Sequence, residues 1–303
     1  MTALRIGTRG SALALAQTGL VADDIATETG ASTELVTITT AGDRSREPLS
    51  RAGGEGLFTG ALRDALLADE CDVIVHSLKD LPTAPHADLT IAAIPVREDA
   101  RDALCARDHF TLETLPHGAK VGTGSPRRAA QLRRRRPDLE IVDIRGNVDT
   151  RLARVSETDL DAVLLAAAGL RRLGRTDAVT EYFDLTRWPT APGQGALAIE
   201  VRRGDEGLVA ALDHIETRAA AEAERHVLAL LEAGCSAPLG AHAIVDAGLL
   251  LLTASVYSLD GSTTLTASHA TEWPDPTAAV DVAASASREL LDGGAAELTG
   301  AAR

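Results

Sequence analysis

Short apolar runs rich in β-branched residues alternate with segments of helical periodicity over the first two-thirds of the chain. This order is typical of a mainly parallel sheet covered by helices. Strands are expected at Leu4–Gly7, Glu34–Thr39 and Asp72–Val75, and helices at Ala12–Glu28 and Leu57–Leu67. The alternation starts again after about residue 100, with strands at Lys120–Gly122, Leu139–Ile144 and Ala162–Leu165, a helix from Pro126 to before Pro137 and another at Val148–Val155. Two such units in series, with crossings near Pro95–Arg101 and Thr190–Gly195, predict a cleft between two α/β domains.

The last part of the chain has a different pattern. An alanine-rich helix is expected at Thr217–Leu231, followed by antiparallel strands at Ala241–Asp246, Leu249–Tyr257 and Thr263–Ser268 and a closing helix at Thr277–Leu291. Turn residues between these strands favour hairpins. We therefore expect a small α+β domain after the two α/β units.

Charge narrows the classes of ligand. The 303 residues carry a net charge of −14, and only 2% are aromatic. Neither a nucleic-acid binder nor a membrane-surface binder is expected, because both need a broad basic face. Arginines nevertheless concentrate between Arg127 and Arg175, which favours a small anionic ligand.

The N-terminal residues lack the basic region and apolar run of a signal peptide, and no stretch reaches the ~20 apolar residues that span a bilayer. Cys71, Cys105 and Cys235 are spaced for neither a disulfide framework nor a zinc site. We expect a cytoplasmic protein with reduced thiols and no metal.

Two strand-to-helix turns carry polar residues. At Thr8–Ser11, Ser11 suits a helix N-cap and Arg9 is a forked donor for a carboxylate, although a plain cap beside a solvated arginine explains this turn better on its own. At Gly122–Arg128, Ser125 suits the cap, and Arg127 and Arg128 come next within the first turn. This second turn favours a carboxylate site.

The predicted strand Asp72–Val75 leads into His76-Ser77-Leu78-Lys79-Asp80. Lys79 can pair with an anion, and Asp80 can accept a hydrogen bond from a ring N–H or stabilise a developing cation. The alternative is a local Lys79–Asp80 ion pair, and His76 is expected to be a packed structural residue.

More arginines occur at loop–helix junctions, including Arg145, Arg151 and Arg172. Any one of them is adequately explained by solvation, but their repeated placement favours a ligand with several carboxylates. Cys235 lies in a loop of small residues, so its thiol is a candidate nucleophile or attachment point, whereas Cys71 and Cys105 are expected to be inert core thiols.

Together these motifs resemble the porphobilinogen deaminase family, from Arg5 into the C-terminal region. The matching segments, in order, are Thr8–Ser11, Gly53–Phe58, His76–Asp80, Gly122–Arg128, Arg145–Asn147, Pro192–Gly195 and the Cys235 loop. The resemblance implies an α/β fold with two periplasmic-binding-protein-like (type II) α/β domains and a small C-terminal α+β domain that carries the cysteine. The implied domains are residues 1–97 plus 196–214, residues 98–195 and residues 215–303.

The resemblance also implies a dipyrromethane cofactor joined to Cys235, on which a monomeric enzyme condenses four porphobilinogen molecules with loss of ammonia, until water releases hydroxymethylbilane. Asp80 matches the catalytic aspartate of the family. Matching positions imply cofactor contacts for Cys235, Lys79, Asp80, Ser125, Arg127, Arg128 and Arg145, and substrate contacts for Arg9, Ser11, Phe58, Arg151, Arg172 and Gln194.

Four residues depart from the family pattern: Glu55 in the glycine-rich loop, where lysine is usual, Ala233 and Ala237 beside Cys235, and Pro126 after Ser125. Two other functions account for part of the sequence. A non-catalytic two-lobed binding protein for a small polycarboxylate leaves Cys235 without a role. An unrelated cysteine-dependent transferase leaves the arginines and Asp80 unexplained.

Overall fold

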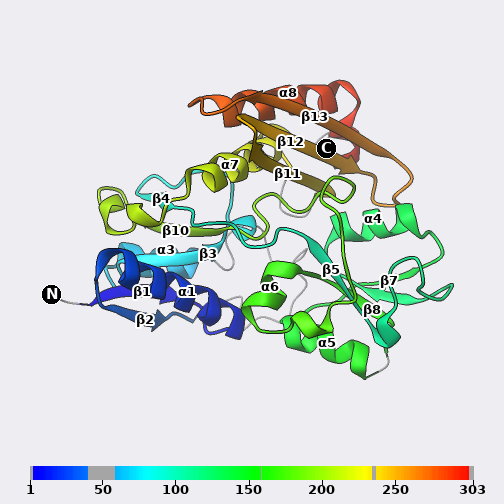
Figure 1. The fold of residues 1–303 in the computed structure, drawn as a ribbon, viewed down its shortest axis with the longest axis horizontal. Coiled ribbons are helices and arrows are strands. Elements are labelled where there is room, and N and C mark those ends of the chain that lie inside the picture. Colours follow the sequence, from blue (N-terminus) through cyan, green and yellow to red (C-terminus); the bar gives the residue numbers. More distant parts are fainter. Residues whose placement is uncertain (1–2, 40–58, 158, 234–236, 300–303) are drawn as a thin grey trace. The chain divides into compact units, whose positions relative to one another are not determined.

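The computed structural model describes residues 3–39, 59–157, 159–233 and 237–299. The chain divides into two compact units (Figure 1): the first is Met1–Arg97 with Ala196–Arg218, and the second is Glu98–Gly195 with Ala219–Arg303. Each unit therefore contains segments that are far apart in the sequence.

The first unit is built on a five-stranded sheet with the strand order β2-β1-β3-β10-β4. Strand β1 pairs in parallel with β2 and β3, whereas β10 runs antiparallel to β3 and β4. The strands are β1 (Leu4–Thr8), β2 (Thr33–Thr37), β3 (Val73–Ser77), β4 (Leu89–Ala93) and β10 (Leu197–Arg202), and the helices are α1 (Ala12–Thr29) and α3 (Gly60–Leu67).

The second unit contains a sheet with the same arrangement, in the order β7-β6-β8-β5-β9. Strand β6 pairs in parallel with β7 and β8, and β5 runs antiparallel to β8 and β9. The strands are β5 (Asp102–Ala106), β6 (Lys120–Gly122), β7 (Glu140–Val142), β8 (Ala162–Ala166) and β9 (Glu181–Tyr182), and the helices are α4 (Pro126–Arg135), α5 (Val148–Ser156) and α6 (Ala167–Arg172).

In each sheet, the strand that runs antiparallel to its neighbours follows the point where the chain passes from one unit to the other. Strand β5 begins shortly after residue 97, and β10 begins shortly after residue 195. Because the two sheets share this order and these directions, the two lobes have one topology. The expected α/β fold class, with two similar lobes and a small C-terminal sheet, is confirmed.

The C-terminal sheet is antiparallel, in the order β11-β12-β13, and α8 lies along it (Figure 1). It has an apolar core of its own, made of residues between Ala219 and Ala295. The elements are α7 (Ile215–Leu230), β11 (Leu239–Asp246), β12 (Leu249–Tyr257), β13 (Thr264–Glu272), α8 (Ala278–Asp292) and α9 (Ala295–Thr299). A division of the second unit into separate domains at residues 98–195 and 215–303 stays a prediction.

Four strands were missing from the prediction, namely β4, β5, β9 and β10. The pattern of apolar residues does not reveal two of them, β5 and β10, because each contains a carboxylate. Strand β5 opens with Asp102, and β10 contains Glu200, yet the structure buries both carboxylates (0% and 2% exposed). An ionised side chain normally marks an exposed position, so buried and paired carboxylates make a strand look like a loop.

Glu200 fixes β10 to its neighbours in the first unit. Its two carboxylate oxygens accept hydrogen bonds from Arg63 on α3, from Nε at 3.0 Å and from Nη2 at 2.8 Å. His76 Nε2, on the paired strand β3, lies 3.3 Å from Glu200 Oε2. Burial alone would raise the pKa of Glu200, but His76 and Arg63 outweigh it and lower the pKa to about 2.

The Glu200→Gln variant removes this charge with little change of shape. At about pH 7 we expect the free energy of unfolding to fall by about 2–4 kcal/mol, because half-buried Arg63 loses its buried carboxylate partner. Since the pKa of Glu200 is lowered on folding, its contribution is complete above the ordinary glutamate pKa and is lost as the pH falls toward 2. Urea unfolding at about pH 7 and about pH 3.5 should therefore show a smaller gap between variant and wild type at the lower pH. Equal gaps would contradict this account.

Candidate functional site

In the first unit, the paired parallel strands β1 and β3 end at the same edge of the sheet. Beyond β1, Ser11 caps α1, and its Oγ accepts a hydrogen bond from Ala14 N at 3.3 Å. Half-buried Arg9 lies in the turn between them. The structure thus presents a guanidinium beside a capped helix start, as predicted for this turn.

Beyond β3, a short 3-10 helix (Leu78–Asp80) presents Lys79, which is half-buried, and Asp80, which is exposed. Hydrogen bonds between Gln17 on α1 and Ser77 at the end of β3 join the two turns, with Gln17 Nε2 at 3.1 Å from Ser77 Oγ. Sequence reasoning missed Gln17. The sequence offers one signal for this role of Gln17, namely a polar amide inside the predicted helix. In the structure the Gln17 side chain is buried, with 7% exposed.

In the second unit, β6 leads into α4 through a tight turn. Gly124 approaches the neighbouring backbone so closely that a Cβ atom there would lie 2.6 Å from Ile144 O. Ser125 is the N-cap, Pro126 opens the helix, and the Ser125 Oγ accepts a hydrogen bond from Arg128 N at 3.5 Å. The predicted cap and helix start are confirmed.

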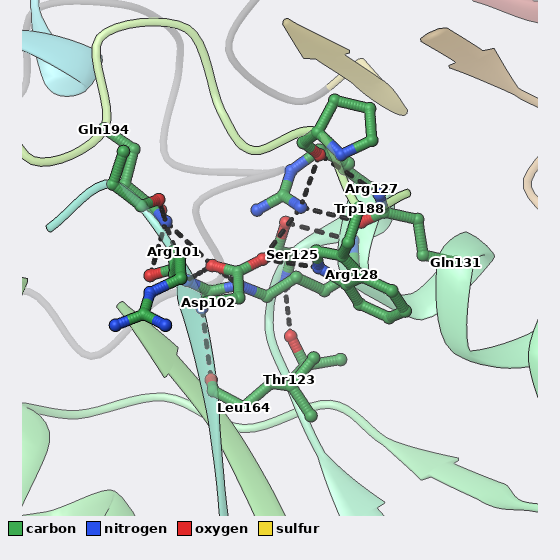
Figure 2. A network of polar contacts seen from close by, with 12 residues as sticks. Arg101, Asp102, Thr123, Ser125, Arg127, Arg128, Gln131, Leu164, Trp188 and Gln194 are labelled. Atoms are coloured by element: carbon green, nitrogen blue, oxygen red, sulfur yellow. Dashed lines mark hydrogen bonds and ion pairs between the residues drawn. The ribbon is translucent and has the colours of Figure 1, made fainter. Parts of the chain in front are cut away.

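Arg127 and Arg128 turn inward from α4 and meet the buried carboxylate of Asp102 (Figure 2). Arg127 Nη1 lies 2.9 Å from Asp102 Oδ2, and Arg128 Nη2 lies 2.6 Å from Asp102 Oδ1. Trp188 Nε1 donates to Oδ2 at 2.8 Å, and Gln194 Nε2 donates to Oδ1 at 2.9 Å. We call these five residues the Asp102 network. Sequence reasoning gave Asp102 and Trp188 no role.

Charge holds Asp102 ionised in this position. Its complete burial would raise the pKa of the carboxyl, but the charges of Arg127 and Arg128 and their hydrogen bonds outweigh burial and hold the pKa far below the ordinary range. Arg127 is itself 2% exposed, and its buried Nε has no hydrogen-bond partner among the residues that the structure describes.

Positive charge gathers beside the network. Arg151 lies on α5, whose N-cap Asn147 comes shortly after Arg145. Burial lowers the pKa of Arg151, and the charges of Arg128 and Arg145 lower it further, against a weaker opposing effect of Asp143. Such mutual repulsion favours the binding of an anion.

Two more predicted site residues meet near residue 195. Arg172 Nη2 donates to Gly195 O at 2.7 Å, and burial lowers the pKa of its guanidinium. Gln194 Nε2 donates to Ala100 O at 2.8 Å as well as to Asp102. The structure therefore brings the second-unit site residues into one region, while Phe58 and Cys235 lie outside the described residues.

The two other cysteines are buried, as expected. Burial raises the pKa of the Cys71 thiol to about 11 and that of Cys105 to about 12, so neither forms a thiolate near neutral pH. Over residues 3–39, 59–157, 159–233 and 237–299, no group of His, Cys, Asp or Glu suits a metal ion. Nor does any helix within those ranges have the length and apolar character to cross a membrane.

Comparison with known proteins gives one consistent result. Residues 4–210 match the family model "Porphobilinogen deaminase, dipyromethane cofactor binding domain", and residues 218–292 match "Porphobilinogen deaminase, C-terminal domain". Porphobilinogen deaminase of Leifsonia xyli is 62% identical, over 98% of this chain and 94% of the relative. The protein of that name from Thermobifida fusca is 52% identical, over 95% and 92%. Among solved structures, a periplasmic substrate-binding protein from Coxiella burnetii covers 69% of this chain and 91% of its own, with a TM-score of 0.43 and 16% identity.

Replacing Asp102 by Asn should lower the free energy of unfolding by about 3–5 kcal/mol, because two buried guanidiniums then lack a counter-charge. The matched control is Asp149→Asn, which disrupts the exposed ion pair with Arg175 and should leave the urea midpoint almost unchanged. Equal effects of the two substitutions on urea unfolding would contradict the stabilising role of the Asp102 network.

Proposed function

The chain belongs to the porphobilinogen deaminase family and is a hydroxymethylbilane synthase, a transferase, and we propose that it builds its product on a dipyrromethane attached to Cys235. The observation that carries this proposal is the concentration of positive charge at Arg151, whose pKa is lowered by burial and by the charges of Arg128 and Arg145. The full-length relatives are porphobilinogen deaminases, so they do not support the alternative of a binding protein without catalysis.

The residues present fit the cofactor. Dipyrromethane carries acetate and propionate groups, and carboxylates are the partners that guanidiniums bind most specifically. We propose that Arg145 and Arg151 hold such carboxylates, together with Lys79, Ser125 and the two arginines of the Asp102 network. When bound, dipyrromethane supplies the pyrrole carbon from which the product chain grows.

Substrate carboxylates need their own donors. We propose that Arg9, Ser11 and Arg172 bind the acetate and propionate of porphobilinogen, and that Gln194 is a further substrate contact. Ser11 and Arg9 lie at a helix N-terminus, where backbone N–H groups add to the attraction for an anion. Phe58 is proposed as a further substrate contact on the basis of the family resemblance.

Asp80 is proposed as the catalytic residue. Its carboxylate is exposed in the 3-10 helix that comes directly after β3. There it can stabilise the cation that forms as ammonia leaves porphobilinogen, and accept hydrogen bonds from pyrrole N–H groups. A fixed negative charge close to a developing positive charge lowers the barrier more than it strengthens substrate binding.

Cys235 is proposed as the attachment residue because the other two thiols are buried and protonated. Two of the departures from the family pattern pack into the C-terminal core: Ala233 is buried, and Ala237 packs against the same cluster. Their small side chains are compatible with the core around them. We further propose a cytoplasmic monomer, as the family resemblance implies.

The direct test of this function is the stoichiometry of the purified protein. It should consume four porphobilinogen molecules and release four ammonia molecules for each hydroxymethylbilane. Binding of porphobilinogen without release of ammonia would refute the assignment.

Asp80→Asn should lower kcat by on the order of 100-fold and change KM by less than about threefold, because carboxylate binding remains while stabilisation of the cation is lost. Initial rates of ammonia release measure both constants. Asp88→Asn, an exposed substitution eight positions along the chain, is the control and should be indistinguishable from wild type. Near-normal kcat in Asp80→Asn would remove Asp80 from the mechanism.

Cys235→Ser should abolish turnover while the thermal midpoint stays within a few degrees of wild type, because the hydroxyl is a far weaker nucleophile than the thiol. Cys105→Ala, at a buried thiol, is the matched control and should keep turnover. Sustained synthesis of hydroxymethylbilane by Cys235→Ser would contradict the attachment assignment.

A further inference from the structure

The carboxylate of Glu224, on helix α7, is completely buried in the second unit (0% exposed). Its Oε2 accepts a hydrogen bond from Gly193 N at 2.6 Å, and its Oε1 accepts one from Ala243 N in β11 at 2.8 Å. Burial of a carboxylate is unfavourable unless hydrogen bonds compensate for the loss of water. Both of these bonds go to backbone N–H groups, so Glu224 fixes the course of the chain at two distant points.

The two N–H groups belong to segments that the structure brings together. Strand β11 is at the edge of its sheet, and one hydrogen bond joins it directly to the neighbouring segment, from Ala241 N to Thr190 O at 2.8 Å. At Ala243 and Gly193, however, both backbone groups are donors, so they cannot bond each other. A carboxylate has two acceptor oxygens and no donor, so it can accept one bond from each. Glu224 therefore bridges β11 and the segment that ends at Gly193.

Gly193 begins a turn that leads to two of the proposed substrate contacts. Gly193 and Gly195 have positive φ angles of 76° and 90°, and a Cβ atom at Gly195 would lie 2.3 Å from Glu98 O. Between them, the Gln194 side chain points into the Asp102 network (Figure 2). Gly195 O accepts a hydrogen bond from Arg172 Nη2 at 2.7 Å. The position of the Arg172 guanidinium therefore depends on where this turn places Gly195 O.

We infer that Glu224 is a positioning residue for substrate binding. Its carboxylate holds the turn of residues 193–195 against β11, and the turn holds the Arg172 guanidinium where it meets a carboxylate of porphobilinogen. This role rests on the proposed function of Arg172 as a substrate contact. A guanidinium has several N–H groups, so the bond to Gly195 O leaves others for the substrate. Glu224 itself touches no substrate and acts only through Gly193 and Gly195.

The chemistry of this bridge distinguishes Glu224 from its closest substitute. Glutamine has nearly the same shape, but its amide offers one acceptor oxygen and an NH2 group, which is a donor. In Glu224→Gln one of the two backbone N–H groups therefore faces another donor, and the turn loses one of its links to β11. A purely structural role of Glu224 would lower stability without a specific loss of affinity for the substrate.

The experiment compares the holoenzymes of Glu224→Gln, Arg172→Lys and the double variant with wild type. Glu216→Gln, an exposed substitution on the same helix, is the control. We measure kcat and KM for porphobilinogen, and hydrogen–deuterium exchange of peptides spanning residues 189–195 and 239–246.

Glu224→Gln should raise KM about tenfold while kcat stays within about threefold of wild type, because substrate affinity is lost and the reacting groups are untouched. It should also speed exchange of both peptides about tenfold. The control should match wild type in every measurement. The KM of the double variant should exceed the larger single effect by at most about twofold, since both substitutions remove the same substrate contact.

A double variant whose KM rises by the product of the two single effects would overturn the inference, because Glu224 would then act independently of Arg172. Unchanged exchange of residues 189–195 in Glu224→Gln would overturn it as well. Should Glu224→Gln fail to fold, Glu224→Asp takes its place, because it keeps both acceptor oxygens and withdraws them by one methylene group. Wild-type KM and exchange in that variant would also contradict the positioning role.

Failure of the proposed function gives a different result. A wild-type protein that releases no ammonia refutes the function, while exchange in Glu224→Gln still decides whether Glu224 holds the turn. An active enzyme in which Arg172→Lys raises KM and Glu224→Gln does not leaves the proposed substrate contact standing and refutes the role of Glu224.

Discussion

The carboxylate of Asp102 is the charge on which the second unit depends. Removing a carboxylate from water is unfavourable by several kcal/mol, and one buried ion pair rarely compensates for that loss. Here two guanidiniums, an indole N–H and an amide all converge on the two oxygens (Figure 2). The donors come from helix α4, from Trp188 and from Gln194. The positions of these three parts of the chain relative to β5 therefore depend on one charge.

The same constraint divides the arginines into two groups. Arg127 and Arg128 have a carboxylate partner within the protein, whereas Arg151 is repelled by its arginine neighbours. An acidic protein with a net charge of −14 can bind a polycarboxylate only if such unbalanced positive charge is concentrated locally. The buried pairs hold the helix start in place, and the positive charge around Arg151 provides the attraction. Both arise from strand-to-helix turns that recur in the two lobes.

Much of this architecture could be predicted from the sequence. The helix caps at Ser11 and Ser125 follow from residue type at a strand-to-helix turn, and the order of elements follows from local periodicity. Strands β5 and β10 could not be predicted in this way. Each contains a charged residue, Asp102 or Glu200, and a charged residue indicates an exposed position when the sequence is considered alone. The arginines that neutralise Asp102 come 25 and 26 residues later in the chain, and Arg63 precedes Glu200 by 137. Burial of a charge depends on such distant partners, which local patterns do not contain. For the same reason, Arg127 and Arg128 look like equivalent ligand donors in the sequence, although the structure gives both an internal acceptor.

The central claim is that the product grows on a dipyrromethane held by Cys235. The measurement that tests it most directly is the intact mass of the purified protein under denaturing conditions, with peptide mapping across Cys235. The account predicts an added mass equal to two linked pyrrole units, confined to the peptide that contains Cys235. The mass of the bare polypeptide, unchanged after incubation with porphobilinogen, would contradict it.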